Sequence, residues 1–396
     1  MLAEPFVGDD ILSYRKDQML NISELKKYYS GKKVLMTGHT GFKGSYMCVL
    51  LKFLGAKVYG YSLKPEKGSL YELLKKGERK LVAGETFADI RDIKKLTAFV
   101  KKVKPDYILH MAAQPLVLRG YKEPRYTYEV NVMGTVNLME AIRQTFSGHG
   151  ILSKINRRRE ACELVSILNV TTDKVYENND LSNYAFKEHD KLCGRDPYAN
   201  SKSCSELVTY AYDKSFFSNK DIFRISTARA GNVIGGGDWA LDRLIPDCIR
   251  AINSDNDIEI RNPIAVRPWQ HVLEPLSGYL LLGQKLFDEG KNYAEGFNFG
   301  PNEDSVLTVA DVAQKVCENY GKGKVVVGEK SPLHEAGLLM LNIEKAKNVL
   351  SWKPTYNADV AISKTVEWYK HFYQKDCDML DFTLSQIEDF EKAKNQ

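Results

Sequence analysis

Short apolar runs alternate with longer stretches of helical periodicity over the first half of the chain. A continuous apolar run bounded by glycine or polar residues is typical of a buried strand, and apolar positions three or four apart are typical of a helix. This alternation implies right-handed β-α-β crossovers and a doubly wound parallel sheet, which is an α/β fold. The predicted strands are residues 33–37, 58–61, 107–111 and 164–170, and the predicted helices are residues 44–54, 93–103, 130–145 and 198–214.

The pattern loosens beyond about residue 230 into shorter elements with many glycines and prolines. We therefore expect residues 31–230 to form the sheet domain and residues 231–375 to form mainly a smaller substrate-binding lobe. The two ends, 1–30 and 376–396, read as polar helical appendages that pack or make oligomer contacts without chemistry. An arginine-containing segment around 147–160 reads as a surface insertion.

Composition narrows the class of protein. The 396 residues are 43% hydrophobic and 27% charged, which is typical of a globular protein, and a net charge of +5 in interspersed residues argues against nucleic acid as a partner. The seven cysteines are scattered and never in a Cys-x-x-Cys spacing, so we expect no disulfide framework, no metal site and a reducing cytoplasm. No apolar run approaches the roughly 20 residues of a membrane span, so we expect no membrane partner.

Three glycines, Gly38, Gly41 and Gly44, fall between the first predicted strand and its helix. Glycine allows a positive φ and a close backbone approach, and a helix N-terminus offers unpaired N–H groups, so this turn predicts a site for the pyrophosphate of a dinucleotide. The three-and-three spacing differs from the commonest dinucleotide fingerprint, and on its own the motif could be only a tight turn.

The end of the second predicted strand carries Ser62 where an acidic residue is usual, which leaves NAD and NADP both open. The residues that follow the other strands complete the expected cofactor site. The predicted cofactor contacts, besides the three glycines, are Thr40, Phe42, Ser62, Asp89, Ile90, Ala112, Ala113 and Gln114.

Tyr198 and Lys202 stand four positions apart and so project from one face of a predicted helix. An ammonium beside a phenol favours the phenolate. A phenolate near a nicotinamide can take a proton from an alcohol while hydride leaves, so both residues are predicted to be catalytic and to contact the cofactor. A Tyr-x-x-x-Lys spacing arises often by chance, but here it follows a glycine cradle and repeated β/α alternation.

At this point the sequence resembles the extended short-chain dehydrogenase/reductase superfamily and, within it, the CDP-glucose 4,6-dehydratase family. The resemblance runs from about residue 33 to 354 and implies that residues 31–230 are a Rossmann-like NAD-binding domain. The stretches that carry it are 37–44, 110–117, 131–137, 170–176, 228–239, 243–246, 267–275 and 334–336.

The resemblance implies conversion of CDP-D-glucose to CDP-4-dehydro-6-deoxy-D-glucose and water, with NAD reduced and reoxidised within one turnover. Tyr198 would take the O4 proton, Lys202 would lower the pKa of the phenol, and Thr172 would hydrogen-bond O4. Asp173 fits the acid that protonates O6. Lys174 stands where related dehydratases carry the base that removes the C5 proton. Lys174 could take this proton itself, could stabilise the enolate that forms, or could leave the C5 proton to another group.

The substrate contacts implied by the resemblance are Gln114, Asn232, Arg243, Arg267 and His271. A homodimer is also implied, paired through the helix that bears Tyr198 and the helix before it. Two other histidines, His39 and His110, are expected to be structural. The alternatives are another NAD-dependent nucleotide-sugar dehydratase, a 4-epimerase, which would not need an acid and base after Thr172, and a non-catalytic NAD-binding regulatory protein.

Overall fold

The computed structural model describes residues 22–77, 79–146, 164–178, 184–218, 222–328 and 339–394. Its centre is a seven-stranded sheet in the order β12-β7-β5-β4-β1-β2-β3, in which every neighbouring pair is parallel. The predicted Rossmann-like doubly wound parallel sheet is confirmed. The strands are β1 Lys33–Thr37, β2 Lys57–Ser62, β3 Gly84–Phe87, β4 Tyr107–His110, β5 Val165–Val170, β7 Phe223–Ala230 and β12 Gly296–Phe299.

Alternate residues of each central strand feed two apolar clusters on opposite faces of the sheet. On β1, Val34 and Met36 join one cluster and Leu35 joins the other. The first cluster includes residues of α1 (Ile22–Tyr29), α2 (Phe42–Phe53) and α10 (Leu273–Glu289), and the second those of α4 (Ile93–Val103) and α7 (Gly134–Phe146). Because both faces are covered, the central strands read as continuous apolar runs in the sequence.

The predicted helices lie close to the observed ones. α4 has the predicted bounds, and α2 begins at Phe42, two residues earlier than predicted. The predicted helix 130–145 is a π-helical turn, η1 (Glu129–Met133), that continues into α7. The helix of Tyr198 is α8 (Pro197–Tyr212), which begins where the Asp196 side chain accepts a hydrogen bond from the Ala199 N–H at 3.0 Å and runs on into η4 (Asp213–Phe217).

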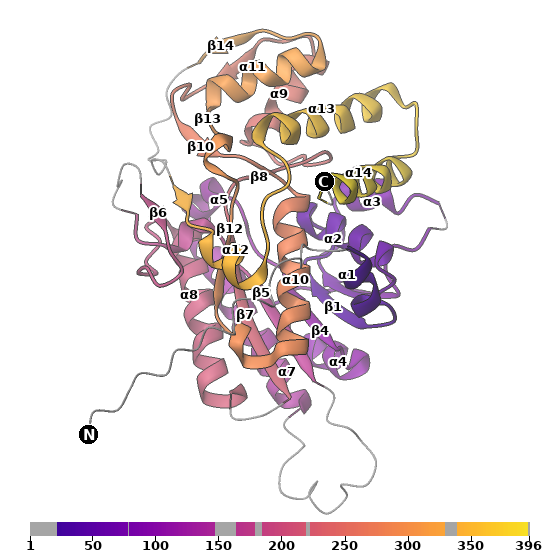
Figure 1. Ribbon diagram of the computed structural model, residues 1–396, viewed down its shortest axis with the longest axis vertical. Coiled ribbons are helices and arrows are strands. Elements are labelled where there is room, and N and C mark those ends of the chain that lie inside the picture. The colour runs from indigo at the N-terminus through magenta and orange to yellow at the C-terminus, as the bar shows by residue number, and fades with distance from the viewer. Residues whose placement is uncertain are drawn as a thin grey trace, which may run out of the picture.

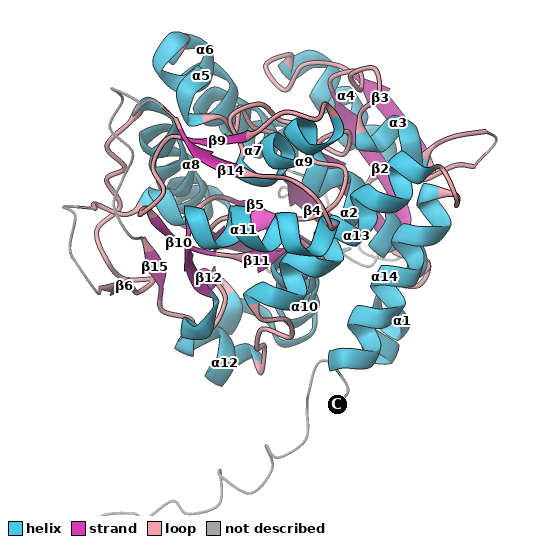
Figure 2. Ribbon diagram, turned by 90° about the horizontal axis from the view of Figure 1, so that it is seen from above, coloured by secondary structure: helices cyan, strands magenta, loops and turns pink. Residues whose placement is uncertain are grey.

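The later part of the chain forms a lobe at one end of the sheet. Its helices α9 (Leu244–Asn253), α11 (Val309–Tyr320) and α13 (Ala358–Gln374) stand above the sheet in Figure 1 and lie over β4 and β5 when seen from above in Figure 2. Four two-stranded sheets accompany them. They are β8 (Val233–Ile234) with β11 (Gln270–His271), β9 (Ile258–Ile260) with β14 (Val325–Val327), β10 (Val266–Pro268) with β13 (Val306–Thr308), and β6 (Ala185–Phe186) with β15 (Met340–Leu341).

The remaining elements are short connections and one C-terminal helix. Within the described ranges, no helix combines the length and apolar character needed to cross a membrane. The connections are α3 (Leu70–Leu74), α5 (Val117–Lys122), α6 (Pro124–Tyr128), η3 (Asp173–Val175), η5 (Gly290–Tyr293), η6 (Glu303–Ser305) and α12 (Glu344–Leu350), and the last helix is α14 (Met379–Lys394).

Both ends of the described chain pack onto the sheet domain. The Tyr29 hydroxyl of α1 donates to the Leu280 carbonyl at 2.8 Å, and Lys394 of α14 donates to Ser277 Oγ at 3.1 Å. β12 joins the sheet from beyond residue 230, although the predicted domain boundaries themselves stay a prediction. The segment 147–160, the motif 334–336 and most of the 1–30 appendage lie outside the described residues.

Candidate active site

The glycine turn between β1 and α2 has the shape of an anion cradle. Gly38 has a φ of +76°, and a Cβ added there would stand 2.7 Å from the Ala112 backbone nitrogen. A Cβ at Gly44 would stand 2.2 Å from the Gly38 carbonyl oxygen. Gly41 caps α2 without any side-chain hydrogen bond, so no side chain takes the first N–H groups of the helix. The cradle therefore fits a dinucleotide pyrophosphate.

Two hydroxyls join the cradle to the end of β2. Thr40 Oγ1 lies 2.8 Å from Ser62 Oγ and donates to the Leu63 carbonyl at 3.1 Å. A short polar side chain thus occupies the place where a carboxylate is usual. Further along, the Arg91 side chain and N–H hold the Asp89 carboxylate and keep its pKa below the usual range. Ile90 is buried beneath Gly134, where an added Cβ would stand 2.8 Å from its Cγ2.

The residues after β4 are held by side chains of the sheet domain. The Ala112 N–H donates to Thr37 Oγ1 at 3.2 Å, which fixes the backbone at Ala112 and Ala113 beside the cradle. The Gln114 carboxamide is engaged on both sides, since its Nε2 donates to Thr127 at 2.9 Å and its Oε1 accepts from the Leu116 N–H at 2.6 Å. Gln114 therefore shapes the wall of the site, and its direct contact with a ligand stays a prediction.

Tyr198, Thr172 and Asp173 form a hydrogen-bonded chain at the end of β5. Tyr198 is hydrogen-bonded to the Thr172 side chain, and Thr172 Oγ1 donates to Asp173 Oδ1 at 2.9 Å. All three side chains are buried. The structure thus brings together three of the five predicted catalytic residues.

Burial raises the pKa of Tyr198 to about 12, against its hydrogen bond with Thr172 and the charge of Arg243, which lower it. The charges that act on the phenol come from Asp173, Arg243 and Asp196. The expected effect of Lys202 on this pKa therefore stays a prediction.

Lys202 follows one turn after Tyr198 and is buried with it. Its ammonium donates to the Val170 carbonyl at 3.0 Å, at the last residue of β5. Burial lowers the pKa of Lys202 to about 8, and the nearby Glu206 carboxylate opposes that shift. The pKa of Lys202 therefore lies below that of a free lysine, while Glu206 favours its charged form.

Asp173 and Lys174 differ in exposure. Asp173 is 2% exposed in the turn η3, and its Oδ2 would lie 2.8 Å from a Cβ added at Gly231. The Lys174 side chain is 26% exposed, and its Nζ lies 3.7 Å from Asp173 Oδ1. The two residues therefore form an ion pair beside the chain that begins at Tyr198.

The predicted substrate residues fall into two groups. Arg243 forms an ion pair with Asp238 at 2.6 Å, and its charge reaches Tyr198, so it borders the catalytic residues. Arg267 lies in β10, where it donates to the Val266 carbonyl at 2.8 Å, and Asn232 accepts from the Gln270 N–H through its own carbonyl at 3.4 Å.

His271 is fully buried, with its ring 5.9 Å from that of Tyr356. Burial lowers the pKa of His271 to about 3, and Lys364 is the charge that adds to the shift. The structure therefore groups His271 with the core under α13 and does not bring it to the catalytic residues.

A buried ion pair beneath the site was not expected from the sequence. Arg229 of β7 contacts Glu206 of α8 through two hydrogen bonds of 2.9 and 3.0 Å. Thr171 and Thr227 donate to the same carboxylate at 2.5 and 2.6 Å. This network fixes the end of β5 on which Thr172 depends. The sequence feature that could have indicated this pair is the position of Glu206, which follows Lys202 by four residues and so lies on the same helix face.

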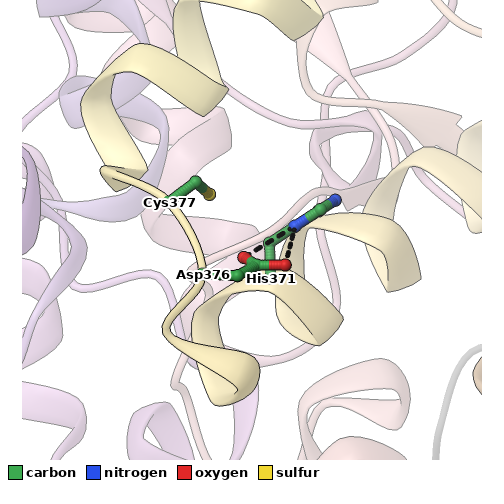
Figure 3. A group of neighbouring side chains, drawn as sticks. All are labelled: His371, Asp376 and Cys377. Atoms are coloured by element: carbon green, nitrogen blue, oxygen red, sulfur yellow. Dashed lines mark hydrogen bonds and ion pairs between the residues drawn. The ribbon is translucent and has the colours of Figure 1, made fainter.

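One surface group resembles a metal site. The ligand atoms of His371, Asp376 and Cys377 lie within 4.8 Å of one another at the junction of α13 and α14 (Figure 3). His371 Nδ1 is already hydrogen-bonded to both Asp376 oxygens, at 2.9 and 3.0 Å, and its ring packs 4.3 Å from that of Phe382. This geometry is that of a surface hydrogen bond, and the expected absence of a metal stays a prediction.

The fold and site define a class of protein. A glycine cradle after β1 and a Tyr-x-x-x-Lys pair on the helix after β5 are the features of the extended short-chain dehydrogenase/reductases. The family model described as GDP-mannose 4,6 dehydratase matches residues 35–365. The chain belongs to this dehydratase family, and the resemblance seen in its motifs is confirmed.

Relatives and solved structures agree with that assignment. A CDP-glucose 4,6-dehydratase of Salmonella typhimurium is 39% identical over 375 residues, which cover 93% of this chain and 98% of the relative. A CDP-paratose 2-epimerase of Salmonella typhi is 26% identical over 85% of this chain and 98% of its own length. The crystal structure of dTDP-glucose 4,6-dehydratase from Bacillus anthracis in complex with NAD superposes with a TM-score of 0.67 at 22% identity, covering 87% of this chain and 98% of that one, and shows the shared fold.

Proposed function

We propose that the protein is an NAD-dependent CDP-glucose 4,6-dehydratase, which converts CDP-D-glucose to CDP-4-dehydro-6-deoxy-D-glucose and water. The observation that carries this proposal is the chain from Tyr198 through Thr172 to Asp173, with Lys174 and Lys202 beside it. These groups supply a base for an alcohol and an acid for a leaving hydroxyl. The 39% identity to a CDP-glucose 4,6-dehydratase supports the choice of substrate.

The cradle of Gly38, Gly41 and Gly44 would hold the pyrophosphate of NAD. The ribose and adenine would lie against Thr40, Phe42, Ser62, Asp89 and Ile90, with the backbone at Ala112, Ala113 and Gln114 along the other side. Bound NAD supplies the hydride acceptor for C4 and later the hydride donor for C6. The backbone at Gly38 lies so close to Ala112 that no side chain fits between them. A backbone free of side chains is what lets a large anion approach the N–H groups of the turn.

Tyr198 acts first, at O4 of the hexose. Its phenolate would accept the O4 proton, and Thr172 would hydrogen-bond the same oxygen. The phenol must lose its proton beforehand, and burial opposes that loss by raising its pKa to about 12. The ammonium of Lys202, one turn away on α8, is the group that would favour the phenolate.

Elimination across C5 and C6 then needs an acid for O6 and a base for C5. Asp173 would protonate O6, because it stands directly after Thr172 and faces Gly231 from a buried position. The ammonium of Lys174 would stabilise the enolate that forms when C5 loses its proton. Asn232, Arg243 and Arg267 are proposed for the nucleotide and diphosphate, and of these Arg243 borders the catalytic residues. His271 is left out of this set because it is fully buried in the core.

Two alternatives fit less well. A 4-epimerase would use Tyr198, Lys202 and Thr172 but has no use for an acidic residue and a lysine directly after Thr172. A regulatory protein that has lost turnover has no need of the intact Tyr198, Thr172 and Lys202. The presence of all five residues therefore favours the dehydratase.

We also propose a homodimer in a reducing cytoplasm. The outward face of α8 exposes Leu207 (54%) and Tyr210 (64%), and η1 beside it exposes Met133 (49%). These side chains suit the α8 face of a second copy. The cysteines of the described residues are all free, which fits the compartment. Light scattering after gel filtration should give twice the monomer mass, and Leu207→Asp should give a monomer; a monomeric wild-type protein would refute the dimer.

The experiment that tests the activity compares substrates. The purified protein is incubated with CDP-glucose, dTDP-glucose or GDP-mannose, and the products are followed by mass spectrometry. Loss of one water from CDP-glucose alone is expected, with Tyr198→Phe as the inactive control. If no substrate loses water, yet the sugar is inverted at C4, the epimerase alternative replaces this proposal.

A further inference from the structure

The turn η3, which carries the residues proposed for the elimination, is fixed at its start by the sheet. Thr171, two residues before the turn, donates its N–H to the Ala228 carbonyl at 2.8 Å and its hydroxyl to Glu206 at 2.5 Å. Thr172 follows directly and is hydrogen-bonded to Tyr198. The groups proposed for the oxidation at C4 therefore depend on contacts made before the turn begins.

The end of the same turn is held from α8. The Ser203 hydroxyl donates to the Val175 carbonyl at 2.7 Å, closer than to the Ala199 carbonyl of its own helix at 3.2 Å. The same oxygen accepts from the Gly194 N–H at 3.0 Å. Ser203 and Val175 are both buried. One serine thus joins the last residue of η3 to the helix that bears Tyr198.

Tyr176 comes directly after the turn, and its buried phenol is engaged in both directions. It donates to Asn298 Oδ1 at 2.7 Å and accepts from Arg229 Nη1 at 2.7 Å. Its ring stacks on Phe186, with the ring centres 5.1 Å apart and the planes 11° apart. Burial raises the pKa of Tyr176, so the phenol keeps its proton and can make both hydrogen bonds.

The phenol of Tyr176 ties the turn to the strand that faces Asp173. Arg229 and Asn298 are paired in register on β7 and β12, so the phenol contacts two neighbouring strands at one level. Two residues beyond Arg229, a Cβ added at Gly231 would stand 2.8 Å from Asp173 Oδ2. The turn and β7 therefore form a closed ring. The phenol joins them at one side, and the carboxylate faces the end of the strand at the other.

We propose that Tyr176 is a positioning residue for the elimination of water, supported from α8 by Ser203, an inference that rests on the proposed dehydratase function. Through its two hydrogen bonds the phenol sets where the Asp173 carboxylate stands relative to β7, and so relative to O6 of the substrate. A misplacement of about 1 Å can cost roughly 100-fold in rate. Oxidation at C4 is spared, because the start of the turn is fixed separately.

The test separates the two steps of the reaction. Tyr176→Phe removes both hydrogen bonds and keeps the stacked ring. Tyr29→Phe is the matched control, since Tyr29 is also fully buried and its hydroxyl donates to the Leu280 carbonyl at 2.8 Å, between α1 and α10. Each protein is mixed rapidly with NAD and CDP-glucose. The absorbance of NADH reports oxidation at C4, and mass spectrometry of quenched samples reports the loss of water.

Tyr176→Phe should bind NAD and form NADH within about threefold of the wild type, yet lose water about 10- to 100-fold more slowly, so that NADH accumulates. Tyr29→Phe should change both rates by less than about threefold, although it too loses a buried hydrogen bond. Equal slowing of both steps by Tyr176→Phe, or the same split in Tyr29→Phe, would mean general structural damage and would overturn the proposal. Unchanged water loss in Tyr176→Phe would overturn it as well.

A second variant reaches the turn from the other side and decides the question where Tyr176→Phe does not fold. Ser203→Ala removes the hydroxyl that holds the Val175 carbonyl, and it should also slow the loss of water more than the formation of NADH. A Ser203→Ala protein that slows both steps alike, or neither, overturns the proposal.

Failure of the underlying function looks different. If the wild-type protein forms NADH from no nucleotide sugar, the dehydratase function itself fails, and this inference fails with it. If the positioning role alone is wrong, the wild-type protein still turns over CDP-glucose, and only the ratio of the two rates in the variants departs from the expected one.

Discussion

Acidification should destabilise the protein through a histidine at the centre of the sheet. His110 ends β4 and is 3% exposed, with Nδ1 2.7 Å from Thr37 Oγ1 and Nε2 3.1 Å from Thr135 Oγ1. Thr135 gives its proton to the Asn131 carbonyl at 2.7 Å, so Nε2–H of His110 must donate to Thr135. Nδ1 then accepts from Thr37. The ring is held neutral, in one tautomer.

The size of the effect follows from linkage. Burial lowers the pKa of His110 to about 3, and the charge of Lys202 adds to the shift. Because the pKa of the folded state is lowered, stability is complete above about pH 6.5 and is lost as pH falls toward 3. Between pH 7 and pH 5 this one ring should cost about 2 kcal/mol of unfolding free energy.

The assay is reversible urea unfolding of wild type and His110→Gln at pH 7, 6 and 5. The free energy of unfolding of the wild type should fall by about 2 kcal/mol more than that of the variant over this range. His271 is present in both proteins, so its contribution cancels. His189→Gln is the control, since that side chain is 79% exposed, and it should keep the wild-type pH dependence. Equal slopes for wild type and His110→Gln would refute the reasoning.

Three other substitutions test separate parts of the structure. Gly44→Ala places a Cβ 2.2 Å from the backbone of the cradle, so NAD should bind at least about tenfold more weakly by calorimetry; unchanged binding would mean that the cradle can open. Glu206→Gln leaves Arg229 buried without its counter-charge, and the free energy of unfolding should fall by about 3–5 kcal/mol in urea, whereas a loss below 1 kcal/mol would contradict the pair. Burial raises the pKa of Glu274 to about 7, and the charge of Lys394 opposes that rise, so the Glu274 contribution to stability is lost as pH rises toward 7. Without the Lys394 charge the pKa of Glu274 should rise further, so Lys394→Met should lose stability above pH 7 as well in thermal unfolding. A variant whose stability parallels that of the wild type from about pH 6 to 8 would argue against this coupling.

The central strands could be predicted from the sequence because they are buried on both faces and are therefore continuous apolar runs. β3 and β12 escaped prediction because they lie at the two edges of the sheet and are only four residues long. β7 escaped for another reason. It buries polar residues such as Ser226 and Arg229 at positions where an apolar side chain is usual, and their partners lie on other elements.

The residues of the site likewise divide into those that local sequence patterns predict and those that depend on contacts with distant parts of the chain. Tyr198 and Lys202 could be predicted because one helical turn relates them, and Thr172 and Asp173 because they follow a recognisable strand. His271 stood in a motif suggestive of ligand binding, but α13 and Tyr356, far along the chain, enclose it.

The position of β12 has a consequence for biosynthesis. β12 completes the edge of the sheet beside β7, yet it is made only after residue 295. Until then the nascent chain carries an open hydrogen-bonding edge along β7, and α10, which covers one face, is itself late. Unpaired strand edges invite association between chains. A fragment that stops near residue 230 should therefore aggregate rather than fold alone. The nascent chain should bind chaperones until β12 has been synthesised and can pair with β7.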